Sequence, residues 1–178
     1  MLRTIKKVLD KSLEVLVASV MAILVADVVW QVFTRFILKN PSSWTEELAT
    51  FLLVWVGLLG ASVALNRGAH LGIDYFVGKL SARKRLYIDC VVFAAVAMFS
   101  LLVLVIGGGK LVNNTLMMNQ TTPALGIKMG YVYLALPISG CFMVLYSVEF
   151  LVQTIVSLVK HRESEVLEHV TSRSSDID

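Results

Sequence analysis

Charged side chains are scarce in this sequence. Asp, Glu, Lys and Arg together make up 16% of the 178 residues, whereas about 25% is usual for a soluble domain. Hydrophobic residues make up 57%, compared with roughly 45–50% in soluble domains. This composition excludes an ordinary soluble enzyme domain.

Motifs for catalysis are also missing. The sequence contains no nucleophile elbow, no H-E-x-x-H zinc motif and no Walker sequence. It also lacks the internal inverted repeat with broken helices that self-sufficient secondary transporters often have. We therefore expect no enzyme activity, no bound cofactor and no metal site in this chain.

Four long stretches contain almost no charge, and each is long enough to cross a membrane as a helix, which takes about 20 apolar residues. They lie at about 12–38, 48–66, 87–109 and 129–159. The strict apolar–polar alternation of a membrane barrel is missing. The sequence therefore predicts an all-α integral membrane protein with one four-helix domain over 1–161, followed by a polar cytoplasmic tail, 162–178, that is partly disordered. The first stretch follows a basic start, as in a signal peptide, but it is longer, so we interpret it as a retained helix.

The basic residues predict the orientation. Twelve of the 16 Lys and Arg residues lie before the first stretch, between the second and third, or after the fourth. The positive-inside rule then places both termini in the cytoplasm. The net charge of +3 is thus a signal of orientation, and no nucleic-acid partner is expected.

The segment between the second and third stretches, residues 67–85, is too polar to span. It is predicted to lie on the cytoplasmic surface as a short amphipathic segment, in which His70 and Asp74 have structural or interfacial roles. Lys84 and Arg85 are expected to meet anionic lipid headgroups. On the other side, residues 110–128 form an uncharged polar connector between two lysines, and Gly107–Gly109 just before it is interpreted as a flexible end of the third span.

Two cysteines are present, Cys90 at the start of the third span and Cys141 near the middle of the fourth. Because their expected depths differ, a disulfide between them is not expected. Each is interpreted as a small buried apolar residue.

Three polar residues interrupt the first span at intervals of four: Asp27, Gln31 and Arg35. This spacing puts them on one face of a helix. An ionisable group in a membrane is costly and needs a partner or a function. We favour a helix–helix or subunit contact over a solute pathway, because one polar stripe offers few ligands.

The second span carries the remaining candidates. Ser43 and Glu46 fit a capping box at its start, Trp44 suits the membrane interface, and either Glu46 or Glu47 is in position to pair with Arg35. Further along, the pairs Gly57/Ala61 and Gly60/Ala64 are spaced for close approach of another helix. The sequence does not show whether that helix belongs to this chain or to a partner.

Four blocks occur in order over 40 residues: Arg35-Phe36, Trp44-Thr45-Glu46-Glu47-Leu48, Trp55 to Ala61 (WVGLLGA) and Arg67 to Asp74 (RGAHLGID). Together with the four-span layout they resemble the DctQ family, the small membrane subunits of tripartite ATP-independent periplasmic (TRAP) transporters. Because the chain ends at Asp178, it resembles the version that is not fused to the large subunit.

The resemblance implies a function that composition does not. Such systems import organic acids, such as C4-dicarboxylates or sialic acids, across the bacterial inner membrane. A periplasmic substrate-binding protein captures the acid, and a large membrane subunit carries it, driven by sodium. The small subunit is expected to brace the static scaffold of the large one and to help dock the binding protein, with sodium coupling in the large partner.

The same resemblance makes Arg35, Trp44, Glu46 and Glu47 the main candidates for organising the periplasmic edge, and His70 and Asp74 for the cytoplasmic segment. Two other functions stay open. One is a stand-alone homo-oligomeric transporter or channel with Asp27 and Glu149 lining its pore. The other is a membrane assembly or sensory protein without transport.

Overall fold

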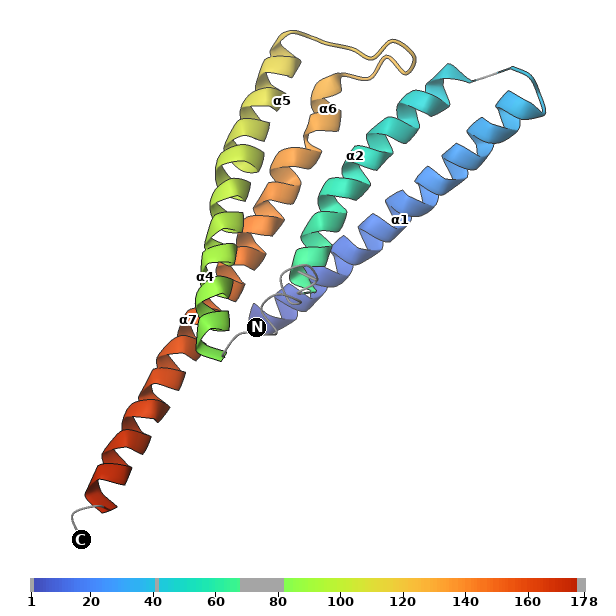
Figure 1. Ribbon diagram of the computed structural model, residues 1–178. Helices are drawn as coiled ribbons and strands as arrows, with labels where there is room; N and C mark the ends of the chain where they lie inside the picture. Colours follow the sequence, from blue (N-terminus) through green and yellow to red (C-terminus); the bar gives the residue numbers. More distant parts are fainter. Residues whose placement is uncertain (1, 41, 68–81, 176–178) are drawn as a thin grey trace.

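The computed structural model describes the backbone of residues 2–40, 42–67 and 82–175, and the side chains of 6–40, 42–67 and 86–159. All regular elements in these ranges are helices, and the only strand-like feature is an isolated bridge between Thr121 and Lys128. Four of the helical segments are long and apolar enough to cross a membrane (Figure 1). They are Lys6–Phe36, Ser43–Asn66, Leu86–Met117 and Met129–Val159. The prediction of an all-α, four-span fold is thereby confirmed.

The segments are built from seven elements. In chain order these are α1 (Leu2–Phe36), α2 (Ser43–Asn66), α4 (Ala82–Phe99), the π-helix η1 (Ser100–Gly107), α5 (Gly108–Met117), α6 (Met129–Tyr133) and α7 (Ala135–Ser175). Several helices extend beyond the predicted spans. Hydropathy detects only the part that suits hydrocarbon, whereas the helical hydrogen bonds continue into polar flanks.

The turn from α1 to α2 is sharp. Lys39 adopts a left-handed backbone conformation (φ 53°), and the backbone N–H of Asn40 donates to the carbonyl of Thr34 over 3.2 Å. At the start of α2 the predicted capping box is wrong. The N-cap residue is Ser42, one position earlier, and its side chain caps no backbone N–H. Instead, the buried Thr45 hydroxyl donates to the Ser42 carbonyl over 2.8 Å.

The third membrane segment continues through its three glycines, contrary to the prediction of a flexible end. Gly107 closes η1, and Gly108 and Gly109 open α5, which runs to Met117. Gly108 is packed closely, since a β-carbon added there would lie 2.8 Å from the β-carbon of Leu136. Gly108 therefore permits a close helix contact, and only the second half of the predicted connector, 118–128, is non-helical.

The fourth membrane segment is interrupted where α6 ends at Tyr133 and α7 begins at Ala135. Pro137 lies in the first turn of α7 and has no backbone N–H to donate, which explains the break. At its other end α7 continues to Ser175. The predicted tail is thus helical up to that residue instead of partly disordered.

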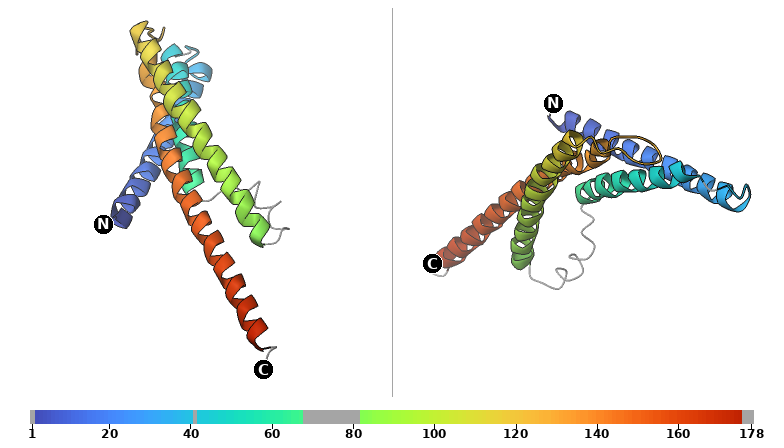
Figure 2. Two further views of the ribbon diagram at one scale, coloured as in Figure 1. Left: turned by 90° about the vertical axis from the view of Figure 1, so that its left-hand side faces the viewer. Right: turned by 90° about the horizontal axis from the view of Figure 1, so that it is seen from above.

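The helices pack as two hairpins. α1 lies against α2, and α4, η1 and α5 lie against α6 and α7, while α2 also packs on α7 and so joins the two pairs. A cluster of Leu13, Leu59, Leu65 and Tyr146 forms the core at this junction. Away from the junction the pairs diverge, and the C-terminal part of α7 projects beyond the other helices (Figures 1 and 2).

The predicted surface segment 67–85 falls largely outside the described part of the chain. This applies to His70 and Asp74, and to the side chains of Lys84 and Arg85. Their predicted roles therefore stay predictions.

Candidate functional site

The α1–α2 turn (37–42) and the α5–α6 loop (118–128) lie at the same end of the molecule, which we call the loop end (Figure 1). The C-terminus of α7 lies at the opposite end. The candidate residues Arg35, Trp44, Glu46 and Glu47 all belong to the loop end.

Glu47 holds the two parts of the loop end together. Its Oε2 accepts hydrogen bonds from the backbone N–H of Leu125 at 2.7 Å and of Ala124 at 3.1 Å. These amides lie 77 and 78 residues further along the chain. A carboxylate bound by two backbone amides makes stronger bonds than a neutral acceptor, so Glu47 attaches the α5–α6 loop to the N-terminal part of α2.

The loop that Glu47 binds is itself ordered by internal hydrogen bonds. The backbone N–H of Thr122 donates to the carbonyl of Ile127 at 2.9 Å, and the buried Thr122 hydroxyl accepts from the N–H of Ile127 at 3.1 Å. Gly126 has a φ of 65°, a conformation that glycine adopts without steric cost. The loop therefore presents a defined backbone to Glu47.

An open hollow lies beside this contact. It has a volume of about 380 Å³ and is lined by Ser43, Glu46, Glu47, Thr50, Pro123 and Ala124. Glu46 is exposed and, among the described residues, its carboxylate has no bonded partner. The hollow is thus a polar notch at the loop end with one free carboxylate.

Arg35 does not pair with either glutamate. Its side chain is exposed, and both ion pairs that the described residues form lie elsewhere. The predicted Arg35–glutamate contact is absent among the described residues: Glu46 has no bonded partner, and Glu47 is directed at the backbone of the α5–α6 loop. That contact has no sequence signal, since any residue supplies a backbone N–H. Trp44 is 45% exposed, which suits the interfacial role predicted for it.

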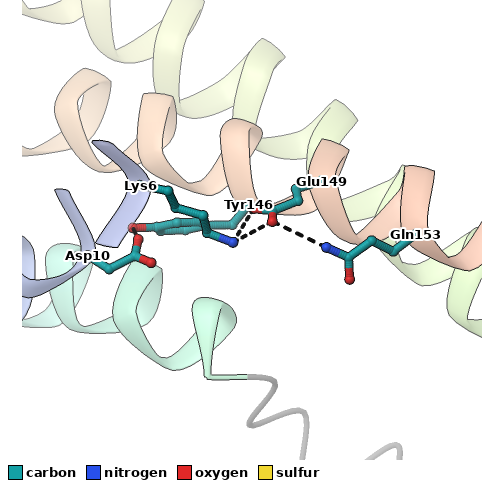
Figure 3. Close-up of polar contacts among 5 residues, drawn as sticks. All are labelled: Lys6, Asp10, Tyr146, Glu149 and Gln153. Carbon is teal, nitrogen blue, oxygen red and sulfur yellow. Dashed lines mark hydrogen bonds and ion pairs between the residues drawn. The ribbon is translucent and has the colours of Figure 1, made fainter. Parts of the chain in front are cut away.

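At the opposite end, α1 is joined to α7 by a polar network that the sequence analysis missed (Figure 3). Lys6 forms an ion pair with Glu149, and Glu149 also accepts a hydrogen bond from the side-chain amide of Gln153 at 3.2 Å. One helical turn away, the Tyr146 hydroxyl donates to Asp10 at 2.7 Å. The sequence did contain a signal for this ion pair, because Glu149 is a lone charge within the fourth span and a charge there requires a partner.

A second ion pair extends this network to α2. Arg67 contacts Glu14 with an N–O distance of 2.9 Å, and Glu14 lies one turn after Asp10 on α1. The side chain of Arg67 is 63% exposed, so this pair contributes little to stability by itself. Together the contacts fix α1 against both α2 and α7 near its N-terminal end.

The three residues of the polar stripe on α1 differ in their exposure. Asp27 is 8% exposed and Gln31 is half-buried, whereas Arg35 is exposed. Because α1 packs chiefly on α2, the first two lie in that helix contact. The Oδ2 atom of Asp27 is buried and has no hydrogen-bond partner among the described residues.

Asp27 is also far from Glu149 along α1. Lys6, the partner of Glu149, precedes Asp27 by 21 positions, or about 32 Å of helix. Asp27 and Glu149 therefore do not form one site.

Among the described residues, Gly57 and Gly60 of α2 have no close neighbour. A β-carbon added at Gly57 or Gly60 would have nothing within 4 Å, and Gly57 and Ala61 are exposed. The close approach occurs instead at Gly140 of α7, where an added β-carbon would lie 2.7 Å from the β-carbon of Leu104. The face of α2 with the small residues is thus free for another molecule.

The cysteines depart from the prediction in one respect. Both are free, but Cys90 is partly exposed and Cys141 is exposed. Their interpretation as buried residues is wrong, because the third and fourth spans each present one side to the surroundings.

Comparison with known proteins agrees with this architecture. The sequence model for "Tripartite ATP-independent periplasmic transporters, DctQ component" matches residues 24–157. The "Sialic acid TRAP transporter small permease protein SiaQ" of Vibrio cholerae is 32% identical over 148 residues, which cover 83% of this chain and 84% of that protein.

Two further relatives match over shorter lengths. The "C4-dicarboxylate TRAP transporter small permease protein DctQ" of Rhodobacter capsulatus is 32% identical over 56% of this chain and 44% of its own. The "Sialic acid TRAP transporter permease protein SiaT" of Haemophilus influenzae is 33% identical over 39% of this chain and 12% of its own. The chain therefore belongs to the DctQ family, the small permease components of tripartite ATP-independent periplasmic transporters.

Proposed function

We propose that this chain is a static brace that enlarges the membrane scaffold of a large transport subunit and does not itself carry solute. The observation that carries the proposal is the distribution of its side chains. Among the described residues, Lys6 pairs with Glu149, Asp10 accepts from Tyr146 and Asp27 is buried, whereas large apolar side chains are exposed along all four spans. Such a surface suits lipid and the apolar face of another membrane protein.

The large partner is supported by one of the relatives. A segment similar to this chain occurs within the permease protein SiaT of Haemophilus influenzae, and the match covers only 12% of that protein. Because the match to the small permease protein SiaQ covers 84% of that protein, we infer that the large membrane subunit is a partner of this chain. The free face of α2, with Gly57 and Ala61, is a suitable place for that contact, because small residues let helix backbones approach closely.

The orientation follows from the basic residues. The loop end carries four of the 16 Lys and Arg residues, and the other end carries twelve. We therefore place both termini in the cytoplasm and the loop end in the periplasm, in a bacterial inner membrane. In this orientation the hollow beside Glu47 faces the side from which a periplasmic substrate-binding protein would approach.

The cargo that fits the family is an organic acid. Two of the relatives are named for sialic acid and one for C4-dicarboxylates. We propose uptake of an acid of this type, driven by sodium, with the sodium sites in the large subunit.

Isolation of the small subunit from native membranes tests this proposal. A tagged copy is expected to co-purify with a much larger multi-span protein in a fixed ratio. The runner-up, a homo-oligomeric channel, predicts instead a purified complex that contains only copies of this chain. The separation of Asp27 from Glu149 argues against that alternative, because the two carboxyl groups that were to line its pore do not form one site.

A further inference from the structure

The C-terminal half of α1 carries an apolar strip on its surface. Four large side chains follow one another at intervals of four, three and four positions, a spacing that puts them on one face of a helix. Each of them is between 40% and 55% exposed. They are Met21, Val25, Val28 and Val32. Three positions after Val32 the same face reaches Arg35 in the last turn of α1, so the strip ends at a cation.

Arg35 and the neighbouring Lys39 have no bonded partner among the described residues. Both side chains are exposed, and the two ion pairs of the described part of the chain lie elsewhere. The two glutamates at the start of α2 are directed away from them. Glu47 accepts from the amides of the α5–α6 loop, and Glu46 lines the hollow beside that loop. The two cations therefore attract a negatively charged group from another molecule.

The turn that carries Lys39 is held against the last turn of α1. The backbone N–H of Ile37 donates to the carbonyl of Phe33 at 2.9 Å. Past Lys39, which has a φ of 53°, the N–H of Asn40 returns to the carbonyl of Thr34 at 3.2 Å. The backbone on both sides of Lys39 is thus fixed to α1, so little of its conformational freedom is lost when a ligand binds.

The strip has the length of one lipid acyl chain. Val25 precedes Arg35 by ten positions, which is about 15 Å of helix at 1.5 Å per residue. The hydrocarbon core of a bilayer is about 30 Å thick, so the chains of one leaflet extend over about 15 Å. A phospholipid with its phosphate at Arg35 would therefore cover the strip with one of its chains.

The composition of the strip favours a lipid chain over a second helix. Close contacts between membrane helices are enriched in small residues, as on the face of α2 with Gly57 and Ala61, and the strip has three valines and one methionine. A flexible chain follows such a surface without close approach of two backbones. Phe36, next to Arg35, is 72% exposed and Trp44 is 45% exposed. Exposed aromatic rings next to basic residues are typical of a membrane–water interface.

We propose that the C-terminal half of α1 and the turn after it bind one anionic phospholipid. Arg35 and Lys39 bind the phosphate and the negatively charged headgroup, since a guanidinium donates two hydrogen bonds to a phosphate and an ammonium adds a point charge. The strip from Met21 to Val32 holds one acyl chain. Because every residue of this site belongs to this chain, the inference goes beyond the proposed function and is tested separately from it.

Native mass spectrometry of the purified full chain in a nonionic detergent tests the proposal. Phosphatidylglycerol is titrated, and the population with one bound lipid gives the Kd. The variant Arg35→Gln/Lys39→Gln is expected to raise this Kd about tenfold, or about 1.4 kcal/mol. Phosphatidylcholine with the same chains carries no net charge, so the wild type is expected to bind it about tenfold more weakly than phosphatidylglycerol, and the variant to distinguish the two lipids little.

A matched control, Lys110→Gln/Lys128→Gln, removes the same charge from two other exposed lysines of the loop end and is expected to leave the Kd unchanged. An equal rise of the Kd in this control would overturn the proposal, since net charge alone would then decide binding.

Glycerol phosphate, a headgroup without acyl chains, is expected not to displace phosphatidylglycerol. Displacement at equal concentration would contradict the role of the strip. Wild-type affinity for phosphatidylglycerol in Arg35→Gln/Lys39→Gln would also overturn the proposal, and a simultaneous loss of a co-purifying large subunit would assign the two cations to that protein instead.

Discussion

Glu47 on α2 accepts a hydrogen bond from the backbone N–H of Leu125 at 2.7 Å, across 78 residues of sequence. With the second bond from Ala124, this one carboxylate connects the N-terminal part of α2 to the α5–α6 loop at the loop end. Glu47 therefore has the loop backbone as its partner in place of an arginine.

Replacement of Glu47 by alanine is expected to release the α5–α6 loop. The loss of two hydrogen bonds to a charged group from a partly exposed loop corresponds to about 1–2 kcal/mol. Hydrogen exchange at the amides of Ala124 and Leu125 is expected to accelerate strongly. Glu46→Ala is the matched control, because its neighbouring carboxylate has no bonded partner, and exchange at these amides should not change in it. Equal protection in Glu47→Ala and the wild type would show that Glu47 does not hold the loop.

The junction of α1 and α7 is expected to depend on Tyr146, which is 5% exposed and donates to Asp10. Tyr146→Phe retains the packing of the ring and removes only the hydroxyl. It is expected to lower the free energy of unfolding by about 1 kcal/mol, measured as a lower Tm of the purified chain. If the Tm is unchanged, the network in Figure 3 does not stabilise the junction.

Alanine substitutions at two glycines are expected to have different effects on stability. Gly140→Ala places a β-carbon against Leu104 and should cost about 1–3 kcal/mol through overpacking. Gly57→Ala has open space around it, so the Tm of the isolated chain should stay the same or rise slightly. A bulky variant, Gly57→Phe, should leave the isolated chain folded and reduce co-purification of the large subunit. Normal recovery of the complex with Gly57→Phe would exclude this face of α2 as the contact.

Asp27 is expected to serve the packing of α1 on α2 and not ion coupling. Asp27→Asn keeps the size and polarity of the side chain and removes its ability to carry charge. Sodium-driven uptake by the complex should therefore be retained. Normal assembly combined with lost sodium dependence would contradict the packing role and assign Asp27 to a transport pathway.

The sequence predicted the four spans because their composition differs sharply from that of the flanks. It also predicted Glu47 as a site residue, but it did not predict the partners of Glu47. These are the backbone amides of Ala124 and Leu125, and every residue except proline has such an amide. The small-residue pairs predicted a close helix approach on α2, and the described residues place no close neighbour at Gly57 or Gly60. They gave no sign that close glycine contacts lie elsewhere, at Gly108 against Leu136 and at Gly140 against Leu104.

The pairing of Lys6 with Glu149 lay within reach of sequence reasoning. A lone glutamate in an apolar span requires a cation, and the basic start of α1 supplies one on the same side of the membrane. The exact partner was not predictable, because four basic residues precede the first span and only the crossing of α1 over α7 selects Lys6.

Reconstituted transport tests most directly the central claim that this chain braces a transporter and carries nothing itself. Proteoliposomes are prepared with the small subunit alone, the large subunit alone, and both together, each with the substrate-binding protein and an inward sodium gradient. Uptake of radiolabelled sialic acid or C4-dicarboxylate is expected only with both subunits present, and the small subunit alone should match empty liposomes. Flux through liposomes that contain only this chain would contradict the account.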